Sequence, residues 1–173
     1  MSEQRNFIPL NIAVMTVSDT RTEETDKSGN KLKSMLEEEG HILADKVIVP
    51  DDIYCIRAEL SAWIADPDIQ VIITTGGTGL TGRDGTPEAV MPLLDKVIDG
   101  FGEMFRAISY DIIGTSTMQS RALAGVANGS FIFCLPGSTG ACKDGWSKLI
   151  SLQLDYRTQP CNLVELMPRL LER

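Results

Sequence analysis

The sequence predicts an α/β fold, a three-layer α/β/α domain with a mainly parallel sheet and one antiparallel hairpin. Short apolar segments rich in β-branched residues alternate with segments whose apolar residues recur at helical spacing. Such alternation is typical of a parallel sheet that is covered by helices on both faces. The pair Asn128-Gly129 between two apolar segments is the strongest short-range signal of a hairpin.

The first half of the chain predicts three strands, over residues 10–17, 41–49 and 69–75. Asp26 or Ser28 is expected to cap the helix between the first two strands, which ends at Gly40. Asp51 or Asp52 is expected to cap the next helix, in which apolar residues recur at helical spacing. Each strand is therefore followed by a helix that can return the chain to the opposite edge of the sheet.

The second half predicts the hairpin and three further helical regions. Thr86-Pro87-Glu88 is a strong helix start, with a hydroxyl cap, and helical spacing continues to residue 97 and over 101–108. Strands follow over 122–127 and 130–135. The turn at residues 136–138 leads into another helix, and a last short helix is predicted over 163–171. Four large side chains on these and the earlier helices are expected to pack in the core: Trp63, Met104, Phe105 and Trp146.

Length and composition indicate one globular domain. The chain has 173 residues, of which 43% are hydrophobic and 23% charged, so disorder and collagen-like repeats are excluded. We assign residues 1–9 to an N-terminal extension and residues 10–152 to the domain. Residues 153–173 form a C-terminal segment that packs on the domain or in an oligomer interface.

Charge and residue usage exclude several classes of protein. A net charge of −8 argues against nucleic-acid binding, although local donors can still hold a small phosphorylated ligand. The four cysteines are scattered, which fits reduced thiols, and the single histidine, His41, excludes a two-histidine metal site. We find neither a signal peptide nor an apolar run that could span a membrane, so we expect a cytoplasmic protein with no membrane partner.

Ligands in such folds bind beyond the carboxyl ends of the strands. Four predicted turns lie at those ends, and we expect them along one rim of the sheet. The turns are Ser18-Asp19, Pro50-Asp51, Gly76 to Asp84, and Pro136 to Ser138. The rim therefore brings the unusual residues of this chain to one place.

The loop over residues 76–87 is the most informative segment, with five glycines in twelve residues directly after a buried strand. Its backbone N–H groups can face an anion, whereas the alternative is a mobile surface turn. Thr78, Thr81, Arg83 and Asp84 in the same loop favour a ligand site. No Gly-Lys-Ser/Thr ends the loop, and its Gly-x-Gly-x-x-Gly lies away from a helix start, which excludes ordinary P-loop kinases and NAD dehydrogenases.

The carboxylates of the rim have two interpretations each. Asp84 beside a phosphate requires a divalent cation between them, but it could instead form a hydrogen bond in the turn near Thr86. Asp51 could cap the following helix, and Asp19 and Asp26 are equally ambiguous. Together, four carboxylates suit Mg²⁺–nucleotide chemistry. We assign the anionic groups of a substrate to three cations: Arg83, Arg121 and Lys143.

These residues resemble a known family. Gly76-Gly-Thr-Gly, Asp84 and Thr86-Pro-Glu-Ala are similar to the signature of the molybdenum cofactor biosynthesis (MoaB/Mog) family, closest to its bacterial MoaB branch. The likeness extends from about Leu10 to Leu152. Further family landmarks in the same order are Thr16-Val-Ser-Asp-Thr-Arg, Asp26-Lys-Ser-Gly, Gly100-Phe-Gly-Glu-Met-Phe-Arg, Gly114-Thr-Ser-Thr, Gln119-Ser-Arg-Ala and Leu135-Pro-Gly-Ser.

The resemblance implies a molybdopterin adenylyltransferase that uses ATP and Mg²⁺ and releases pyrophosphate. It also implies a homotrimer or homohexamer and contacts with other cofactor-assembly proteins. Asp51 and Asp84 correspond to the family's functional, metal-holding pair. Substrate-binding positions by the same resemblance are Ser18, Asp19, Ser28, Gly76, Gly77, Thr78, Gly79, Arg83, Ser120 (a pterin contact), Pro136, Gly137 and Ser138.

The chain keeps both Pro50-Asp51 and Arg83-Asp84, which some inactive relatives replace, and this favours activity. The alternative is a catalytically inactive, oligomeric molybdopterin-binding protein of the same pathway. A nucleotide-dependent switch is disfavoured because the phosphate-loop lysine is missing.

Overall fold

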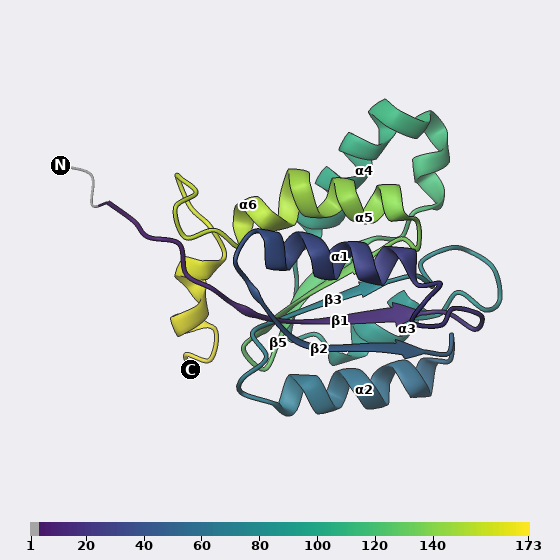
Figure 1. The fold of residues 1–173 in the computed structure, drawn as a ribbon, viewed down its shortest axis with the longest axis horizontal. Coiled ribbons are helices and arrows are strands. Elements are labelled where there is room, and N and C mark those ends of the chain that lie inside the picture. The colour runs from purple at the N-terminus through teal and green to yellow at the C-terminus, as the bar shows by residue number, and fades with distance from the viewer. Residues whose placement is uncertain (1–3) are drawn as a thin grey trace.

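A computed structural model describes residues 4–173, which form a six-stranded sheet with helices on both faces (Figure 1). The strands lie in the order β2-β1-β3-β6-β5-β4. Their bounds are β1 Asn11–Val17, β2 Ile42–Val49, β3 Val71–Thr75, β4 Lys96–Val97, β5 Leu123–Ala127 and β6 Ser130–Leu135. The helices are α1 Lys27–Glu38, α2 Ile53–Ala65, α3 Thr86–Val90, α4 Asp99–Ile113, α5 Thr139–Gly145 and α6 Ser151–Gln153, with short helical turns at Met91–Leu93, Gly114–Gln119, Trp146–Ile150 and Val164–Arg169.

The predicted sheet and hairpin are confirmed. β2, β1, β3 and β6 are parallel neighbours, and β5 runs antiparallel to both β6 and β4. At the hairpin turn Asn128 and Gly129 have φ values of 46° and 85°, the left-handed conformations that a tight two-residue turn requires.

The prediction that helix continues to residue 97 is wrong. The helical turn ends at Leu93, and Lys96–Val97 forms the edge strand β4. Gly125 of β5 makes this possible, because a Cβ atom there would lie 2.5 Å from Leu94 and 2.6 Å from the carbonyl oxygen of Lys96. The close approach depends on a glycine in another segment, so helical spacing alone does not reveal it.

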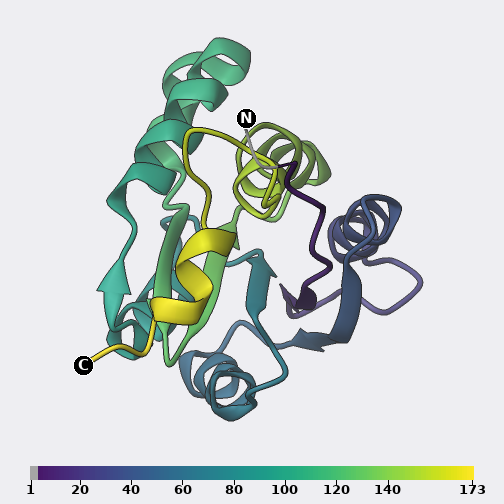
Figure 2. The same ribbon diagram turned by 90° about the vertical axis from the view of Figure 1, so that its left-hand side faces the viewer.

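Two separate cores form on the two faces of the sheet (Figure 2). One packs α1, α4 and α5 against the sheet and includes Trp146, and the other packs α2 and α3 and includes Trp63. Both tryptophans and Phe105 are buried as predicted. Met104 is 57% exposed on α4, so its predicted place in the core is wrong.

Helix caps decide which carboxylates remain available to the rim. Asp26 caps α1 by accepting from the Gly29 N–H at 3.0 Å. Asp52, rather than Asp51, caps α2. Thr86 is not the predicted cap of α3: Gly85 holds that position, and the Thr86 hydroxyl donates to the Gly76 carbonyl at 2.8 Å. The cap assignments thus leave the Asp51 side chain outside helix α2.

The segment from residue 4 to β1 and the C-terminal segment lie at the end of the sheet opposite the carboxyl ends of β1 and β3 (Figure 1). Val164 is buried, and Leu163 and Leu170 pack against the core that includes Trp146. Arg5 forms an ion pair with Glu165, which joins the two terminal segments. Within residues 4–173 no helix is long and apolar enough to cross a membrane.

Candidate active site

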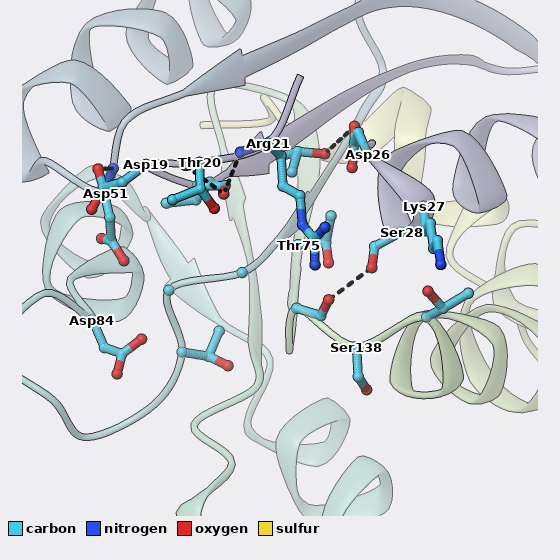
Figure 3. A pocket seen from close by; sticks show the side chains of 18 residues that line it. Asp19, Thr20, Arg21, Asp26, Lys27, Ser28, Asp51, Thr75, Asp84 and Ser138 are labelled. Carbon is cyan, nitrogen blue, oxygen red and sulfur yellow. Dashed lines mark hydrogen bonds between the residues drawn. The ribbon is translucent and has the colours of Figure 1, made fainter. Parts of the chain in front are cut away.

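A cleft of about 620 Å³ lies at the carboxyl ends of β1 and β3 and beside the first turns of α1 and α5 (Figure 3). It is lined by Thr16, Val17, Ser18, Asp19, Thr20, Arg21, Asp26, Lys27, Ser28, Asp51, Thr75, Gly76, Gly77, Thr78, Asp84, Gly137, Ser138 and Thr139. Residues from all four of the predicted rim turns therefore meet at one cleft.

Ten of the positions assigned by resemblance line this cleft: Ser18, Asp19, Ser28, Asp51, Gly76, Gly77, Thr78, Asp84, Gly137 and Ser138. Gly79, Arg83 and Pro136 belong to the rim turns but do not line the cleft, and Ser120, which follows the helical turn Gly114–Gln119, does not line it either. The Pro136 carbonyl instead accepts a hydrogen bond from Thr75, at 3.0 Å. Within the described residues, the buried Ser120 hydroxyl has no hydrogen-bond partner.

The floor of the cleft is a pair of glycines with left-handed backbone. Gly76 and Gly77 have φ values of 100° and 68°, which residues with a side chain adopt only with strain. A Cβ on Gly76 would lie 2.3 Å from the Val17 carbonyl oxygen, and one on Gly77 would lie 2.3 Å from the Thr86 hydroxyl. The backbone thus lies directly against β1 and α3. Gly76 is buried and its N–H donates to the Leu135 carbonyl at 3.0 Å, whereas Gly77 is partly exposed.

Asp51 stands at the edge of this floor with its pKa raised. Burial is the main cause, the neighbouring Asp84 and Asp19 add to it, and the Gly85 N–H donating to Asp51 opposes it. A carboxylate that burial and like charges disfavour gains most from a cation. The electrostatics of Asp51 therefore favour a bound positive charge.

Asp84 is held differently, and its pKa is lowered. The Thr81 hydroxyl and backbone N–H donate to its Oδ2 at 2.7 and 2.9 Å. A Cβ on Gly79 would lie 2.6 Å from the same oxygen, so glycine permits this close approach. The carboxylate does form a turn, as the structural alternative predicted, but with Thr81 rather than near Thr86.

The cations assigned to a substrate are engaged elsewhere. Arg83 donates to both carboxylate oxygens of Asp19, and the Asp19 Oδ1 also accepts from the Asp51 N–H at 3.0 Å. Arg121 pairs with Glu88 and donates to the carbonyl oxygens of Gly79 and Asp84. Arg83 thus joins the glycine loop to the turn after β1, and Arg121 binds its carbonyl oxygens.

Lys143 is exposed on α5 and does not line the cleft. Arg83, Arg121 and Lys143 do not line the cleft, and their assignment to substrate anions stays a prediction.

Sequence reasoning missed the two basic residues that do line the cleft, Arg21 and Lys27. Arg21 follows β1 by four residues and Lys27 is the first residue of α1. Their position next to Asp19 and Asp26 was the available signal, since the rim argument applies to every residue between β1 and α1.

Asp26 has a structural role beneath these cations. Its buried carboxylate accepts from the Thr16 hydroxyl at 2.8 Å and from Gly29, and it lies 3.0 Å from the Lys46 amine. Next to it, the Ser28 hydroxyl donates to the Gly137 carbonyl at 2.7 Å, which joins α1 to the turn after β6. The two walls of the cleft are thereby connected.

The donor set at Asp51 and Asp84 fits Mg²⁺. No group of three or more acidic, histidine or cysteine side chains that could hold a metal gathers within residues 4–173. Mg²⁺ in nucleotide sites is commonly held by one or two carboxylates, with water and phosphate oxygens completing the shell. Two carboxylates on the wall of an open cleft match that pattern, since water and phosphate oxygens can supply the remaining ligands.

Comparison with known proteins gives a consistent result. Residues 13–156 match the family model MoCF_biosynth, described as a probable molybdopterin binding domain. The chain is 56% identical over 156 residues to Molybdenum cofactor biosynthesis protein B of Escherichia coli K12, an alignment that covers 90% of this chain and 92% of that protein.

Solved structures agree. A crystal structure of a Molybdenum cofactor biosynthesis protein B aligns with a TM-score of 0.84 and 46% identity, covering 87% of this chain and 94% of the other. The tungsten cofactor synthesizing protein MoaB from Pyrococcus furiosus aligns with a TM-score of 0.74 and 38% identity, covering 83% and 91%. With a family model matched over most of its length and relatives this similar, the chain belongs to the MoaB/Mog family of molybdenum cofactor biosynthesis proteins.

Proposed function

We propose that the protein acts in molybdenum cofactor biosynthesis by adenylylating molybdopterin with Mg·ATP, which yields adenylyl-molybdopterin and pyrophosphate. The observation that carries the proposal is the pair Asp51 and Asp84 in one cleft with the partly exposed backbone of Gly77. Carboxylates next to a backbone N–H group that can bind an anion are the arrangement expected where a cation and phosphates bind together.

The proposed step is a phosphoryl substitution. An oxygen of the terminal phosphate of molybdopterin attacks the α-phosphorus of ATP and forms the new P–O bond. The bond from the α-phosphorus to the bridging oxygen breaks, and pyrophosphate leaves with that electron pair. Because both reactants are anions, alignment and charge neutralisation account for most of the rate increase.

The chain's own residues supply the alignment. Asp51 and Asp84 are the residues that would hold Mg²⁺. When bound, the ion neutralises phosphate oxygens and stabilises the charge that develops on them. The partly exposed backbone of Gly77 lines the cleft where phosphate oxygens would bind, and the Arg83–Asp19 pair keeps the glycine loop against the turn after β1.

The test is pyrophosphate release by purified protein with Mg·ATP and molybdopterin. Release that requires molybdopterin, and falls by about a hundredfold or more in Asp84→Asn, supports the adenylyltransferase and the role of Asp84. Asn keeps an oxygen that can accept from Thr81, so the fold should persist. The matched control is Asp68→Asn in the exposed turn between α2 and β3, which should retain full activity.

The second candidate is a non-catalytic molybdopterin-binding protein. The observation that favours it is the hydrogen bond from Thr81, which lowers the pKa of Asp84. This bond stabilises the ionised carboxylate of Asp84 without a metal ion. Tight molybdopterin binding without pyrophosphate release from the wild-type protein would select this alternative.

We also propose that the protein is a homo-oligomer, a trimer or hexamer. α4 and the turn after it expose a set of large apolar side chains, and a second copy of this chain presents the same kind of surface. The residues are Met104, Tyr110, Ile112, Ile113 and Met118. Light scattering should give a mass three or six times 18.9 kDa, and Ile112→Glu should lower it; a wild-type monomer would contradict the proposal.

A further inference from the structure

The two ends of the cleft carry opposite charge. Asp51 follows β2 and Asp84 lies in the loop after β3, and both adjoin the face of the sheet covered by α2 and α3. Lys27 begins α1 and Ser138 caps α5, on the other face. Figure 3 shows Asp19, Asp51 and Asp84 at one end, and Arg21, Lys27 and Ser138 toward the other, where Asp26 also lies.

The side chains of Arg21 and Lys27 are the basic groups that line the cleft. Both are exposed lining residues, and within residues 4–173 neither forms an ion pair. Arg83, by contrast, is bound bidentately to Asp19. A bound anion can therefore reach Arg21 and Lys27 without breaking an existing ion pair.

The nearest carboxylate does not cancel this positive charge. Asp26 is 1% exposed, and it lies 3.0 Å from the Lys46 amine, whose side chain is 6% exposed. Lys46 approaches from β2 and pairs with both Asp26 and the exposed Glu23. Neither Glu23 nor Glu24 lines the cleft, so the exposed charged side chains that line this end are Arg21 and Lys27.

A hydroxyl donor completes the basic end. The Ser138 Oγ accepts from the Ala141 N–H at 3.1 Å, so its own proton remains available to a ligand oxygen. Ser28 differs, because its hydroxyl proton is already donated to Gly137. The positive end of the twelve-residue helix α1 adds to the potential that Lys27 creates there.

We infer that Arg21, Lys27 and Ser138 form a phosphate subsite that works without metal, distinct from the metal-holding end at Asp51 and Asp84. The inference deepens the proposed function and rests on it for the identity of the ligand. The shared chemistry is a dianionic phosphate group, which belongs either to the β- and γ-phosphates of ATP or to the terminal phosphate of molybdopterin. Either source would be anchored while the α-phosphorus lies toward the acidic end.

The test measures binding of inorganic pyrophosphate by calorimetry in the presence of a chelator. We expect Arg21→Gln and Lys27→Gln each to weaken binding about tenfold or more. The matched control is Lys33→Gln, on the same helix but outside the cleft, and Asp51→Asn removes a charge from the other end. Both should bind at least as tightly as the wild type.

Two further arms separate the sources of the phosphate. If the subsite takes the phosphates of ATP, the wild type binds ATP more tightly than AMP, and Lys27→Gln removes that preference. If it takes molybdopterin, the variant weakens molybdopterin binding and leaves the ATP-to-AMP preference unchanged.

Failure of the inference is separable from failure of the proposed function. If pyrophosphate does not bind without metal, or binds the wild type and all variants equally, the proposed subsite is wrong. This conclusion does not depend on whether the protein releases pyrophosphate from Mg·ATP. Wild-type protein that binds pyrophosphate through Arg21 and Lys27 but releases none from Mg·ATP and molybdopterin keeps the subsite and rejects the adenylyltransferase.

Discussion

The hydroxyl of Thr81 donates a 2.7 Å hydrogen bond to the carboxylate of Asp84, three residues further along the same loop. This contact is the main cause of the lowered pKa of Asp84. Under the proposed function Asp84 holds a metal ion and must be ionised, so Thr81 would extend the pH range over which Asp84 acts.

The first prediction follows from this contact. In Thr81→Val the pKa of Asp84 rises toward its ordinary value, since the ionised form loses a donor. Because the carboxylate then protonates at higher pH, the acid limb of pyrophosphate release should move upward. A pH profile of the wild type and variant measures this. Thr158→Val, in the C-terminal segment and outside the cleft lining, should leave the limb in place; an unmoved limb in Thr81→Val would show that Asp84 ionisation does not control the rate.

The second prediction concerns Gly29, whose missing side chain makes room for the cap of α1. A Cβ there would lie 2.2 Å from Asp26 Oδ2 and 2.4 Å from Thr16 Oγ1. Gly29→Ala should therefore lower the free energy of unfolding by about 2 kcal/mol, through loss of the cap and local overpacking.

Denaturant unfolding provides the measurement for Gly29→Ala. Gly140→Ala on α5 is the matched control, because a Cβ there meets nothing within 4 Å. It should stabilise the protein by roughly 0.5 kcal/mol. Equal behaviour of the two variants would mean that the contacts around Gly29 relax without cost.

The third prediction concerns the buried pair Lys46 and Asp26. Removal of one partner from such a pair leaves an uncompensated charge, and Lys46→Met should cost about 3–5 kcal/mol of unfolding free energy. The double variant Lys46→Met/Asp26→Asn should recover much of that loss, because Asn has no charge and can still accept from Gly29. A double variant no more stable than Lys46→Met would argue against charge as the cause.

The fourth prediction concerns His41, which is buried between the rings of Phe7 and Trp146. Its Nδ1 accepts from the Leu10 N–H at 3.2 Å. Burial lowers the pKa of His41 below 6.5, opposed by the charge of Asp155. A depressed pKa means that the folded state resists protonation, so the stability due to neutral His41 is full above pH 6.5 and is lost as the pH falls toward the folded pKa.

Unfolding free energies on either side of pH 6.5 test the His41 prediction. His41→Asn keeps an acceptor for Leu10 but cannot titrate, so its stability should fall less steeply below that pH than that of the wild type. Parallel curves for the two proteins would assign the acid sensitivity to other groups.

Much of the fold could be predicted from the sequence, because its signals are local. Apolar runs marked β1, β2 and β3, and Asn128-Gly129 marked the hairpin. The two-residue strand β4 carries no periodicity of its own. It exists because β5 offers an edge to pair with and Gly125 leaves space beside it, and neither condition can be read from residues 96–97.

The position of the cleft was also predictable, for a topological reason. Parallel strands all end at the same edge, so the residues that follow β1, β2, β3 and β6 meet there whatever the details of packing. Local capping preference could not separate Asp51 from Asp52, since both precede α2. The backbone conformation at Asp52 decided which side chain caps the helix and which one faces the cleft.

The sequence by itself thus determined the order of the elements apart from β4, the rim and the family. Only the tertiary structure decided which charges of the rim are available to a ligand. Arg83 and Asp19 are 64 residues apart, and Arg121 and Glu88 are 33 apart, yet each pair is joined, while Arg21 and Lys27 line the cleft unpaired. Ion pairs depend on distances between side chains from distant segments, and those distances exist only once the chain has folded.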